Sequence, residues 1–405
     1  MAYVPPHKRH SMESGDPSPV PASIRRQFKR GLNFRSPRAN AHQSGKIVYA
    51  DTAIYRWLAV GLDDDGDHLP SGFFLKPVSV EALERRSGEK LLALAKNCVA
   101  NEDDETSQDH SKKPWIHIAE TVMPDLVSSY EVVRSEIEGQ RMEEIKPALV
   151  ARFGKILFHG NPSFPVETCG DMLREASLRQ LKRSFYINHP ASFVENVTLR
   201  IIPEICLSFA YEKDLYHVKL SDKSRPGATI SCKCVVSKSE QRLELYKIQL
   251  NQVRHMVVDV SCLNKDLDMR LMLRTRSMLT AISEKEKNSI RDLITSAVID
   301  SSVNGGLKWP LGKESSGDRY SIIGACHIIS KTYKNSSMRL KVTHADQFDF
   351  RSSQGEVTEE TVLKLKGITS ELHGQILGTD VISDMLKDAV KMMWEHFLSC
   401  GNTVI

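Results

Sequence analysis

The sequence lacks several features that would place it in a familiar class of protein. It has no run of about 18 apolar residues, which excludes a membrane-spanning helix. Its first residues contain no apolar stretch, so we expect no secretory signal. Cysteine is sparse, with eight residues in 405 and no C-x-x-C pair, unlike a disulfide framework. These absences predict reduced thiols and a location in the nucleus or the cytoplasm.

Motifs of known catalytic chemistry are also missing. The sequence contains no G-x-S-x-G, H-E-x-x-H or G-x-G-x-x-G pattern. Aspartates such as Asp259, Asp268 and Asp346 lie near the ends of predicted strands, but no pattern gathers the several acids that two-metal catalysis needs. We therefore expect a protein without a cofactor and favour a non-catalytic role.

What the sequence does have is a sharp division of charge. Residues 1–46 carry nine Lys and Arg against two acidic residues, a net charge of +7, whereas residues 47–405 sum to −3. The basic segment also holds six of the 17 prolines and few aliphatic side chains. Such a segment cannot bury enough apolar surface to offset its chain entropy, so we expect residues 1–45 to be a disordered tail. Its candidate phosphate-binding residues are Lys8, Arg9, Arg25, Arg26, Lys29, Arg30, Arg35 and Arg38.

Two kinds of partner suit this tail. Its bases are of the type that contacts RNA phosphates or an RNA-associated protein, and Ile24, Phe28 and Leu32 have helical spacing that suits folding on a partner. Alternatively, the opening peptide with Tyr3, Pro5 and Pro6 docks on another protein, in which case its apolar side chains matter more than its charge.

The remainder is typical of an α+β protein. Between about residues 198 and 273 strand-like segments follow one another with short connections, which predicts antiparallel pairing. Helices are expected at about residues 284–299, 359–365 and 380–398, the first with a capping box that begins at Ser283. Residues 115–118 and 198–202 are expected as strands. The expected class is α+β, with mostly antiparallel sheets and flanking helices.

The expected domain organisation follows from these segments. Residues 46–370 form an α+β domain, interrupted by a flexible acidic loop at about 101–113. Residues 371–405 form an amphipathic C-terminal helix packed on that domain. Whether 46–370 is one domain or two, and the oligomeric state, stay open.

A glycine-rich segment at residues 304–320 is one candidate ligand loop. Glycine amides together with a lysine can cradle phosphate, and a tryptophan can stack on a base. The residues in question are Lys308, Trp309, Lys313 and Arg319. The alternative is an ordinary helix-to-strand connection in which Trp309 packs on the core.

Two histidines form a second candidate. If 334–337 is the turn of a hairpin, His327 lies opposite His344, with Asp346 nearby. The pair would be a weak metal site or a pH-sensitive pair, or else two half-buried neutral histidines. Joined with Lys308, Arg319 and Asp346 in a pocket, it would favour an enzyme of unknown class.

Cys232 and Cys234 form the third candidate. On a strand, Ile230, Cys232, Cys234 and Val236 share one face, which favours a core position over zinc binding, because structural zinc needs four ligands.

The segment Ala2-Tyr-Val-Pro-Pro-His-Lys-Arg9 resembles a short N-terminal element of some DEAD-box RNA helicases and other RNA-associated proteins. The chain as a whole resembles a plant family of uncharacterised proteins that share this start. The passages that carry the likeness are 152–160, 216–221, 306–312 and 348–352. The resemblance implies no activity and no site residues.

The function expected from the sequence is therefore non-catalytic binding of RNA or of an RNA-associated protein, with the basic tail on phosphate. The alternatives are an enzyme with its site near residues 304–320 and the two histidines, and a protein-interaction module that uses the opening peptide.

Overall fold

A computed structural model describes residues 47–60, 73–96, 113–139, 144–160, 175–225, 229–237, 242–278, 282–315, 317, 319–374 and 378–399. These residues all belong to one compact unit, Ser44–Ile405. The tail and residues 101–112 of the predicted acidic loop lie outside the described residues, so the expectations about them stay predictions.

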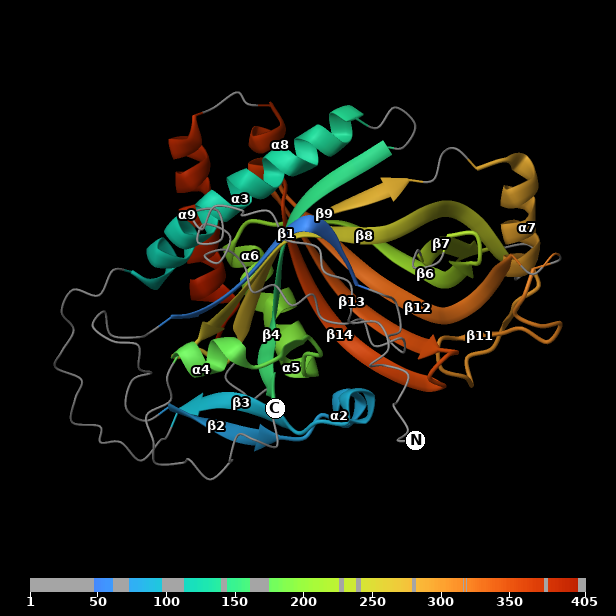
Figure 1. Cartoon of the computed structure of the whole chain (residues 1–405), viewed down its shortest axis with the longest axis horizontal. Helices are drawn as coiled ribbons and strands as arrows, with labels where there is room; N and C mark the ends of the chain where they lie inside the picture. Colours follow the sequence, from blue (N-terminus) through green and yellow to red (C-terminus); the bar gives the residue numbers. More distant parts are fainter. Residues whose placement is uncertain are drawn as a thin grey trace, which may run out of the picture. The chain divides into compact units, whose positions relative to one another are not determined.

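Eight antiparallel strands close into a ring. Each strand pairs with the next, and β9 pairs with both β4 and β8, so the sheet returns on itself as a barrel (Figure 1). In order around the ring, the strands are β8 (Leu243–Cys262), β7 (Thr229–Val236), β6 (Ser208–Asp222), β12 (Tyr320–Lys334), β13 (Met338–Asp349), β14 (Gln354–Leu365), β4 (Glu144–His159) and β9 (Asp268–Met278).

Further strands extend the sheet beyond the ring. β1 (Val48–Val60) runs parallel to β8, whereas β5 (Arg183–Tyr186) and β3 (Leu91–Lys96) both pair with β4. β2 (Phe73–Val78) pairs with β3, and β10 (Val298–Ile299) forms a separate ribbon with β11 (Leu307–Lys308).

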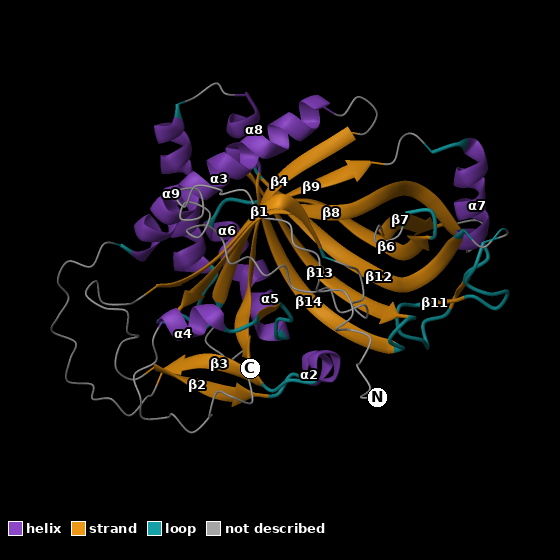
Figure 2. Cartoon of the chain, viewed as in Figure 1, coloured by secondary structure: helices purple, strands orange, loops and turns teal. Residues whose placement is uncertain are grey.

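Helices cover the outer face of the barrel on two sides (Figure 2). The long helix α3 and the C-terminal helices α8 and α9 lie together, while α7 packs against β8 on the other side. The helices are α2 (Glu81–Ser87), α3 (Pro114–Gly139), α4 (Glu175–Gln180), α5 (Ala191–Asn196), the π-helix η3 (Val197–Ile201), α6 (Ile202–Glu204), α7 (Glu284–Thr295), α8 (Lys366–Gly374) and α9 (Thr379–His396). No described helix is both long and apolar enough to cross a membrane.

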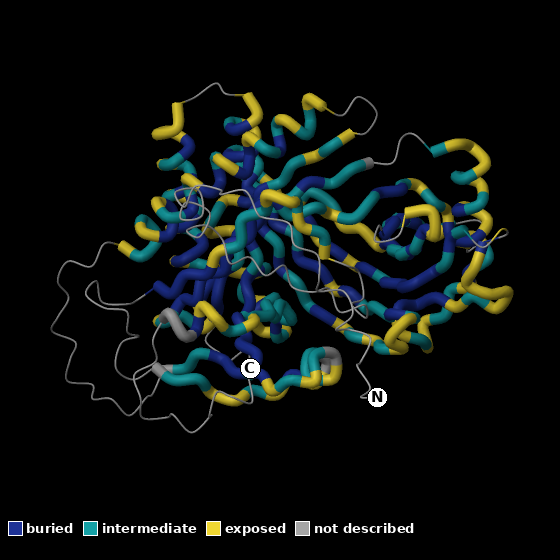
Figure 3. Tube along the Cα trace, viewed as in Figure 1, coloured by how far each residue is buried: buried dark blue, intermediate teal, exposed yellow. Residues whose placement is uncertain are grey.

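The hydrophobic core lies between these helices and the outer face of the strands. Leu271 and Leu273 of β9 are fully buried in one cluster with Val122 of α3 and Leu386 of α9. A second cluster joins β6, β7 and β12 to α7. Figure 3 shows the strands alternating between buried and half-buried stretches, whereas exposed residues gather on α7 and on turns. Because successive side chains of a strand point to opposite faces, the residues between the core positions point into the barrel.

The α+β class with a mostly antiparallel sheet is confirmed. The strand predicted at 229–236 and the capping box of α7 are also confirmed, since Ser283 and the Glu286 side chain satisfy each other's backbone amides. Three element predictions are wrong. Residues 115–118 begin helix α3, residues 198–202 form a π-helical turn and the start of α6, and residues 359–365 are strand β14.

Candidate anion-binding site

The inner face of the barrel is lined with basic side chains. On β9 they alternate with buried leucines, and on β6 and β13 they alternate with residues of the outer face. Most of them are half-buried, which means that they retain contact with solvent although they point away from the surface of the unit. This inner cationic cluster comprises Arg152, Lys213, Lys219, Lys233, Lys247, Arg254, Arg274, Arg276, Arg339, Lys341 and Lys364.

Bases on strands that are not neighbours influence one another across the barrel. Arg276 on β9 lowers the pKa of Lys341 on β13, of Lys233 on β7 and of Lys364 on β14, in each case after the larger effect of burial. None of these three strands pairs with β9. The side chains therefore converge on one shared interior rather than lying on separate patches.

Crowding of like charge makes full protonation of the cluster unfavourable. Burial, followed by the charges of Arg276 and Lys247, lowers the pKa of Lys233 to about 7. Burial, followed by Arg339 and Arg274, lowers the pKa of Lys364 to about 8.

The neighbouring imidazole responds in the same way. Burial and then Lys233 lower the pKa of His217 to about 3, so this side chain is neutral at physiological pH. The arrangement is electrostatically unfavourable in the empty protein, which is a common signature of a binding site.

Carboxylates on the inner face are few, and they form ion pairs with only some of the basic side chains. Glu360 lies 3.8 Å from Arg152, and Glu144 lies 2.7 Å from Lys146 at the start of β4. Within the described part of the chain no carboxylate forms an ion pair with Lys219, Lys233 or Arg276, or with Lys341 or Lys364. The interior therefore carries an excess of positive charge that Glu360 and Glu144 offset only in part.

One part of the inner face is neutralised and packed. Arg270 holds both oxygens of the fully buried Asp259, at 2.5 and 2.7 Å, and the Tyr55 hydroxyl donates to the same carboxylate at 2.7 Å. Val257 and Met272 are buried beside this network. A buried charge pair of this geometry anchors β1, β8 and β9 to one another and offers no charge to a ligand.

The end of the barrel at the starts of β4 and β8 is exposed. Lys146 at the start of β4 has a side chain that is 57% exposed, and Tyr246, the extra residue of a bulge near the start of β8, is 47% exposed. Lys213, near the start of β6, is exposed and lies over the ring of Tyr211 at 4.9 Å. We call Lys146, Tyr211, Lys213, Tyr246 and Lys247 the rim.

The bases of the predicted ligand loop contact groups of the protein itself. Lys308 forms an ion pair with Asp300 at 2.5 Å, and the Lys313 ammonium lies 4.6 Å from the centre of the Phe350 ring. Arg319 donates twice to Asp222, at 3.0 and 3.1 Å, and also contacts Glu286.

Trp309 is docked in the same way. Its indole donates to the carbonyl of Leu293 at 3.0 Å, and its ring meets Phe350 edge-on. The loop thus has the contacts of a structural connection, and its role as a ligand loop stays a prediction.

The predicted opposition of His327 and His344 is wrong. The hairpin register is shifted by two residues, so that His327 lies opposite Asp346 and His344 lies opposite Ile329. His327 instead bonds Asp214 at 2.7 Å and stacks on Tyr216, while His344 bonds Glu359 at 2.5 Å. Each imidazole has its own carboxylate partner on the outer face. The turn lies at 335–338, one residue later than predicted, and this shifts every cross-strand partner by two residues.

The core position of the paired cysteines is confirmed. Cys232 and Cys234 are fully buried beside Ile230 in the cluster under α7. Burial raises the pKa of both thiols, to about 12 for Cys234. Among the described residues, no group of three or more His, Cys, Asp or Glu side chains is placed to hold a metal ion. The tail bases from Lys8 to Arg38 lie outside the described residues.

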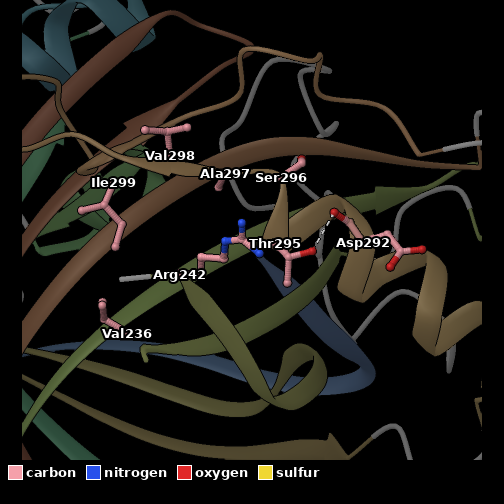
Figure 4. Close-up of a pocket in the computed structure, with 8 residues that line it drawn as sticks. All are labelled: Val236, Arg242, Asp292, Thr295, Ser296, Ala297, Val298 and Ile299. Atoms are coloured by element: carbon pink, nitrogen blue, oxygen red, sulfur yellow. Dashed lines mark hydrogen bonds between the residues drawn. The ribbon is translucent and has the colours of Figure 1, made fainter. Parts of the chain in front are cut away.

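A cavity lies between α7 and the start of β8, outside the barrel (Figure 4). It has a volume of about 910 Å³ and is lined by Val236, Arg242, Asp292 and residues 295–299. The Thr295 hydroxyl donates a hydrogen bond to the carbonyl of Asp292 at 3.1 Å, and the other residues that line the cavity are mainly apolar. This cavity has no cluster of bases comparable with the inner face.

The inner cationic cluster was not predicted from the sequence, although a signal exists. Three of the four alternate positions carry a basic or imidazole side chain in Lys213-x-Leu-x-His-x-Lys219 and in Arg270-x-Met-x-Arg-x-Arg276. Such alternation is normally interpreted as a solvent-facing side of a sheet. Only closure of the ring turns that side into an interior.

Likeness to solved structures is weak. An RNA triphosphatase from S. pombe, Pct1, matches with a TM-score of 0.41 and 12% identity, over 73% of this chain and 95% of that one. The same enzyme in complex with the Spt5 CTD matches at the same score over 69% and 89%. The PH1012 protein of Pyrococcus horikoshii matches with a TM-score of 0.24 and 8% identity, over 54% of this chain and 95% of that one.

Comparison with protein families gives a clearer result. No curated protein matches this chain. A family model described as domain of unknown function DUF7903 matches residues 41–397, which leaves out the opening segment Ala2–Arg9 and nearly all of the basic tail. The chain therefore belongs to the DUF7903 family.

Proposed function

We propose that the inner face of the barrel binds a phosphate-rich anion. The observation that carries the proposal is the convergence of Arg276, Lys233, Lys341 and Lys364 on one interior without ion-paired carboxylates among the described residues. A bound anion would remove the mutual repulsion of these cations, and it would raise the lowered pKa values of Lys233 and Lys364 toward the ordinary lysine value.

The residue types favour phosphate over a single carboxylate. Arginine offers a planar fork of donors to phosphate oxygens, and lysine offers a mobile point charge. The cluster mixes both types over several strands, which suits a ligand with several anionic groups rather than one.

The size of the ring restricts the form of the ligand. A barrel of eight strands is just wide enough for its own side chains or for one small ligand. A double-stranded nucleic acid is far too wide to enter it. The proposed ligand is therefore a short phosphate chain or the phosphorylated end of a single strand.

The basic tail fits the same proposal as a second contact. If Arg25, Arg26, Lys29 and Arg30 bind the phosphates of a single strand while the barrel holds its end, RNA or an RNA-associated particle is the natural partner.

The test is a calorimetric titration of the full-length protein with inorganic tripolyphosphate. The double variant Arg276→Gln/Lys341→Gln should bind at least about tenfold more weakly, because each charged hydrogen bond contributes about 1.5–3 kcal/mol. The matched control is Lys308→Gln, which removes a lysine that is already paired with Asp300 on the outside of the barrel. Equal binding by all three proteins, or no binding by the wild type, would refute the proposal.

A further inference from the structure

Three polar side chains form a line of contacts at the end of β4, separate from the inner cationic cluster. The Nε2 atom of His159 lies 2.7 Å from the hydroxyl of Ser184 on β5, and its Nδ1 atom lies 2.7 Å from a carboxylate oxygen of Glu89. His159 is the last residue of β4, whereas the rim includes Lys146 near the start of that strand. A hydroxyl on one ring nitrogen and a carboxylate on the other is the arrangement that activates a serine nucleophile.

The pairing of β4 with β3 on one edge and with β5 on the other brings the three side chains together (Figure 1). Leu157 of β4 lies opposite Ser184, and His159 lies on the same face two residues later. Glu89 comes just before β3, where Gly88 ends α2 in the left-handed conformation and turns the chain. Three separate parts of the sequence thus supply one residue each.

The imidazole is buried, whereas its two partners are not. The His159 side chain is 5% exposed, the Glu89 side chain is 39% exposed, and Ser184 is half-buried. Burial and then the charge of Lys182 lower the pKa of His159, although Glu89 opposes them. The ring is therefore neutral at physiological pH, which is the form that accepts a proton from a serine hydroxyl.

The contact with Glu89 is close, but it is not aligned as a hydrogen bond, since the Nδ1 atom has no hydrogen-bond partner among the described residues. Catalytic contacts are often poorly aligned until a substrate is bound. His255 provides a contrast, because its Nε2 atom meets both the Thr275 hydroxyl, at 2.9 Å, and Glu136, at 3.6 Å. An acid and a hydroxyl on the same nitrogen cannot divide the roles of orienting the ring and losing a proton to it.

Lys182 adds a positive charge to the same cluster. Its ammonium donates to the Glu89 carboxylate at 3.0 Å. The His159 amide donates to the Lys182 carbonyl at 2.9 Å, which continues the ladder of β4 and β5, so Lys182 and Ser184 share one face. A cation on that face favours the negative charge that develops on a carbonyl oxygen under attack by the serine.

We propose that Ser184, His159 and Glu89 form a second functional site, which hydrolyses esters of small carboxylic acids. Ser184 and His159 are the catalytic residues. Glu89 is a positioning residue that favours the proton on Nδ1, so that Nε2 is free to accept one. A small acyl group is expected because Ser184 is half-buried.

The reaction has two balanced stages. The Ser184 oxygen bonds to the ester carbonyl carbon and gives its proton to Nε2 of His159. The bond from that carbon to the alcohol oxygen breaks, and the alcohol leaves with the proton. Water then loses a proton to His159 and attacks the acyl-serine. The Ser184 oxygen leaves with that proton, and the carboxylic acid is released.

The experiment treats the full-length protein with a fluorophosphonate, which forms a phosphorus–oxygen bond to an activated serine as fluoride leaves. Mass spectrometry then identifies the modified residues. Ser184 should react at least about 100-fold faster than Ser221, since a general base contributes about 10²–10⁴-fold. Ser221 is the matched control, because its hydroxyl bonds another hydroxyl, that of Ser321, at 2.6 Å. Reaction of Ser184 at the rate of Ser221 would overturn the proposal without the use of any variant.

Variants then test the roles with p-nitrophenyl acetate as the ester. Ser184→Ala should abolish hydrolysis, whereas Ser221→Ala should leave it unchanged. His159→Gln should prevent modification of Ser184 by the fluorophosphonate. Glu89→Gln should lower kcat with KM nearly unchanged, as expected of a residue that acts through His159. Hydrolysis that persists in Ser184→Ala would overturn the proposal, and none of these results bears on anion binding by the barrel.

Discussion

Lys233 is the side chain that reports most directly on the state of the barrel. Burial, Arg276 and Lys247 hold its pKa at about 7, well below the ordinary lysine value. Near pH 8.5 most molecules of the empty protein therefore lack this proton. A bound anion favours the charged form, so the complex keeps the proton to higher pH than the empty protein does.

Binding at alkaline pH should consequently take up a proton at Lys233. The affinity for an anion should fall as the pH rises from about 7 toward the higher pKa of Lys233 in the complex. The complex holds more protons than the empty protein, so rising pH disfavours it relative to the empty protein. The probe should be inorganic sulfate, because it is small and its own charge is constant in this range.

Calorimetry in two buffers of different ionisation enthalpy measures the proton uptake. Uptake of up to one proton is expected near pH 8, with a smaller contribution from Lys364, whose pKa is about 8. Lys233→Met should lose most of the uptake. An affinity that rises with pH would contradict this account of the site.

The strands show which parts of the structure can be predicted from the sequence. β7 was predicted because its outer face is an unbroken alternation of apolar residues, from Ile230 to Cys234, under α7. β14 was mistaken for a helix over 359–365, because its inward positions carry Glu360 and Lys364 and its apolar residues show no clear period of two. A polar interior removes the contrast between buried and exposed faces on which pattern reasoning depends.

The hairpin of β12 and β13 shows a second limit. Its strands were predicted correctly, but the register was not, because the turn contains no Asn-Gly or similar signal that fixes the loop length. A shift of two residues keeps every side chain on its predicted face. The histidines therefore stay on one face while their partners change, and any site that depends on direct opposition is lost.

The inner face of β13 should also be a source of instability in the empty protein. Lys341 is half-buried among like charges, and burial together with Arg276 lowers its pKa. We expect Lys341→Met to stabilise the unliganded protein by about 1 kcal/mol, because an apolar side chain of similar length removes desolvation and repulsion.

Urea denaturation of the wild type and of Lys341→Met measures this difference in stability. If the two proteins have the same m-value, the shift of the transition midpoint gives the difference directly. Lys308→Met serves as the control, and it should change stability by about 0.5 kcal/mol or less, because its ion pair is partly exposed. A large loss of stability in Lys341→Met would mean that this lysine supports the fold rather than a ligand.

At the scale of the whole molecule, closure of the ring is what creates the candidate site. Arg276 and Lys341 are separated by 65 positions in the sequence, and they meet only because β9 pairs with both β4 and β8. Helices α3, α8 and α9 on one side and α7 on the other bury the apolar outer face, so the charged face is left to the interior (Figure 1). The local sequence pattern indicated the class of fold. The pairing of β9 with β4 and β8, which brings the basic side chains together, joins segments far apart in the sequence and has no local sequence signal.

Lysine footprinting of the full-length protein tests the central claim most directly. The protein would be acylated briefly with and without saturating tripolyphosphate, and the modified lysines would be read by mass spectrometry. We predict that Lys233, Lys341 and Lys364 become protected, whereas Lys308 and Lys387 on the outer surface react equally in both samples. Protection confined to Lys8, Lys29 and Lys46, with the lysines of the barrel unchanged, would contradict the claim and assign anion binding to the tail.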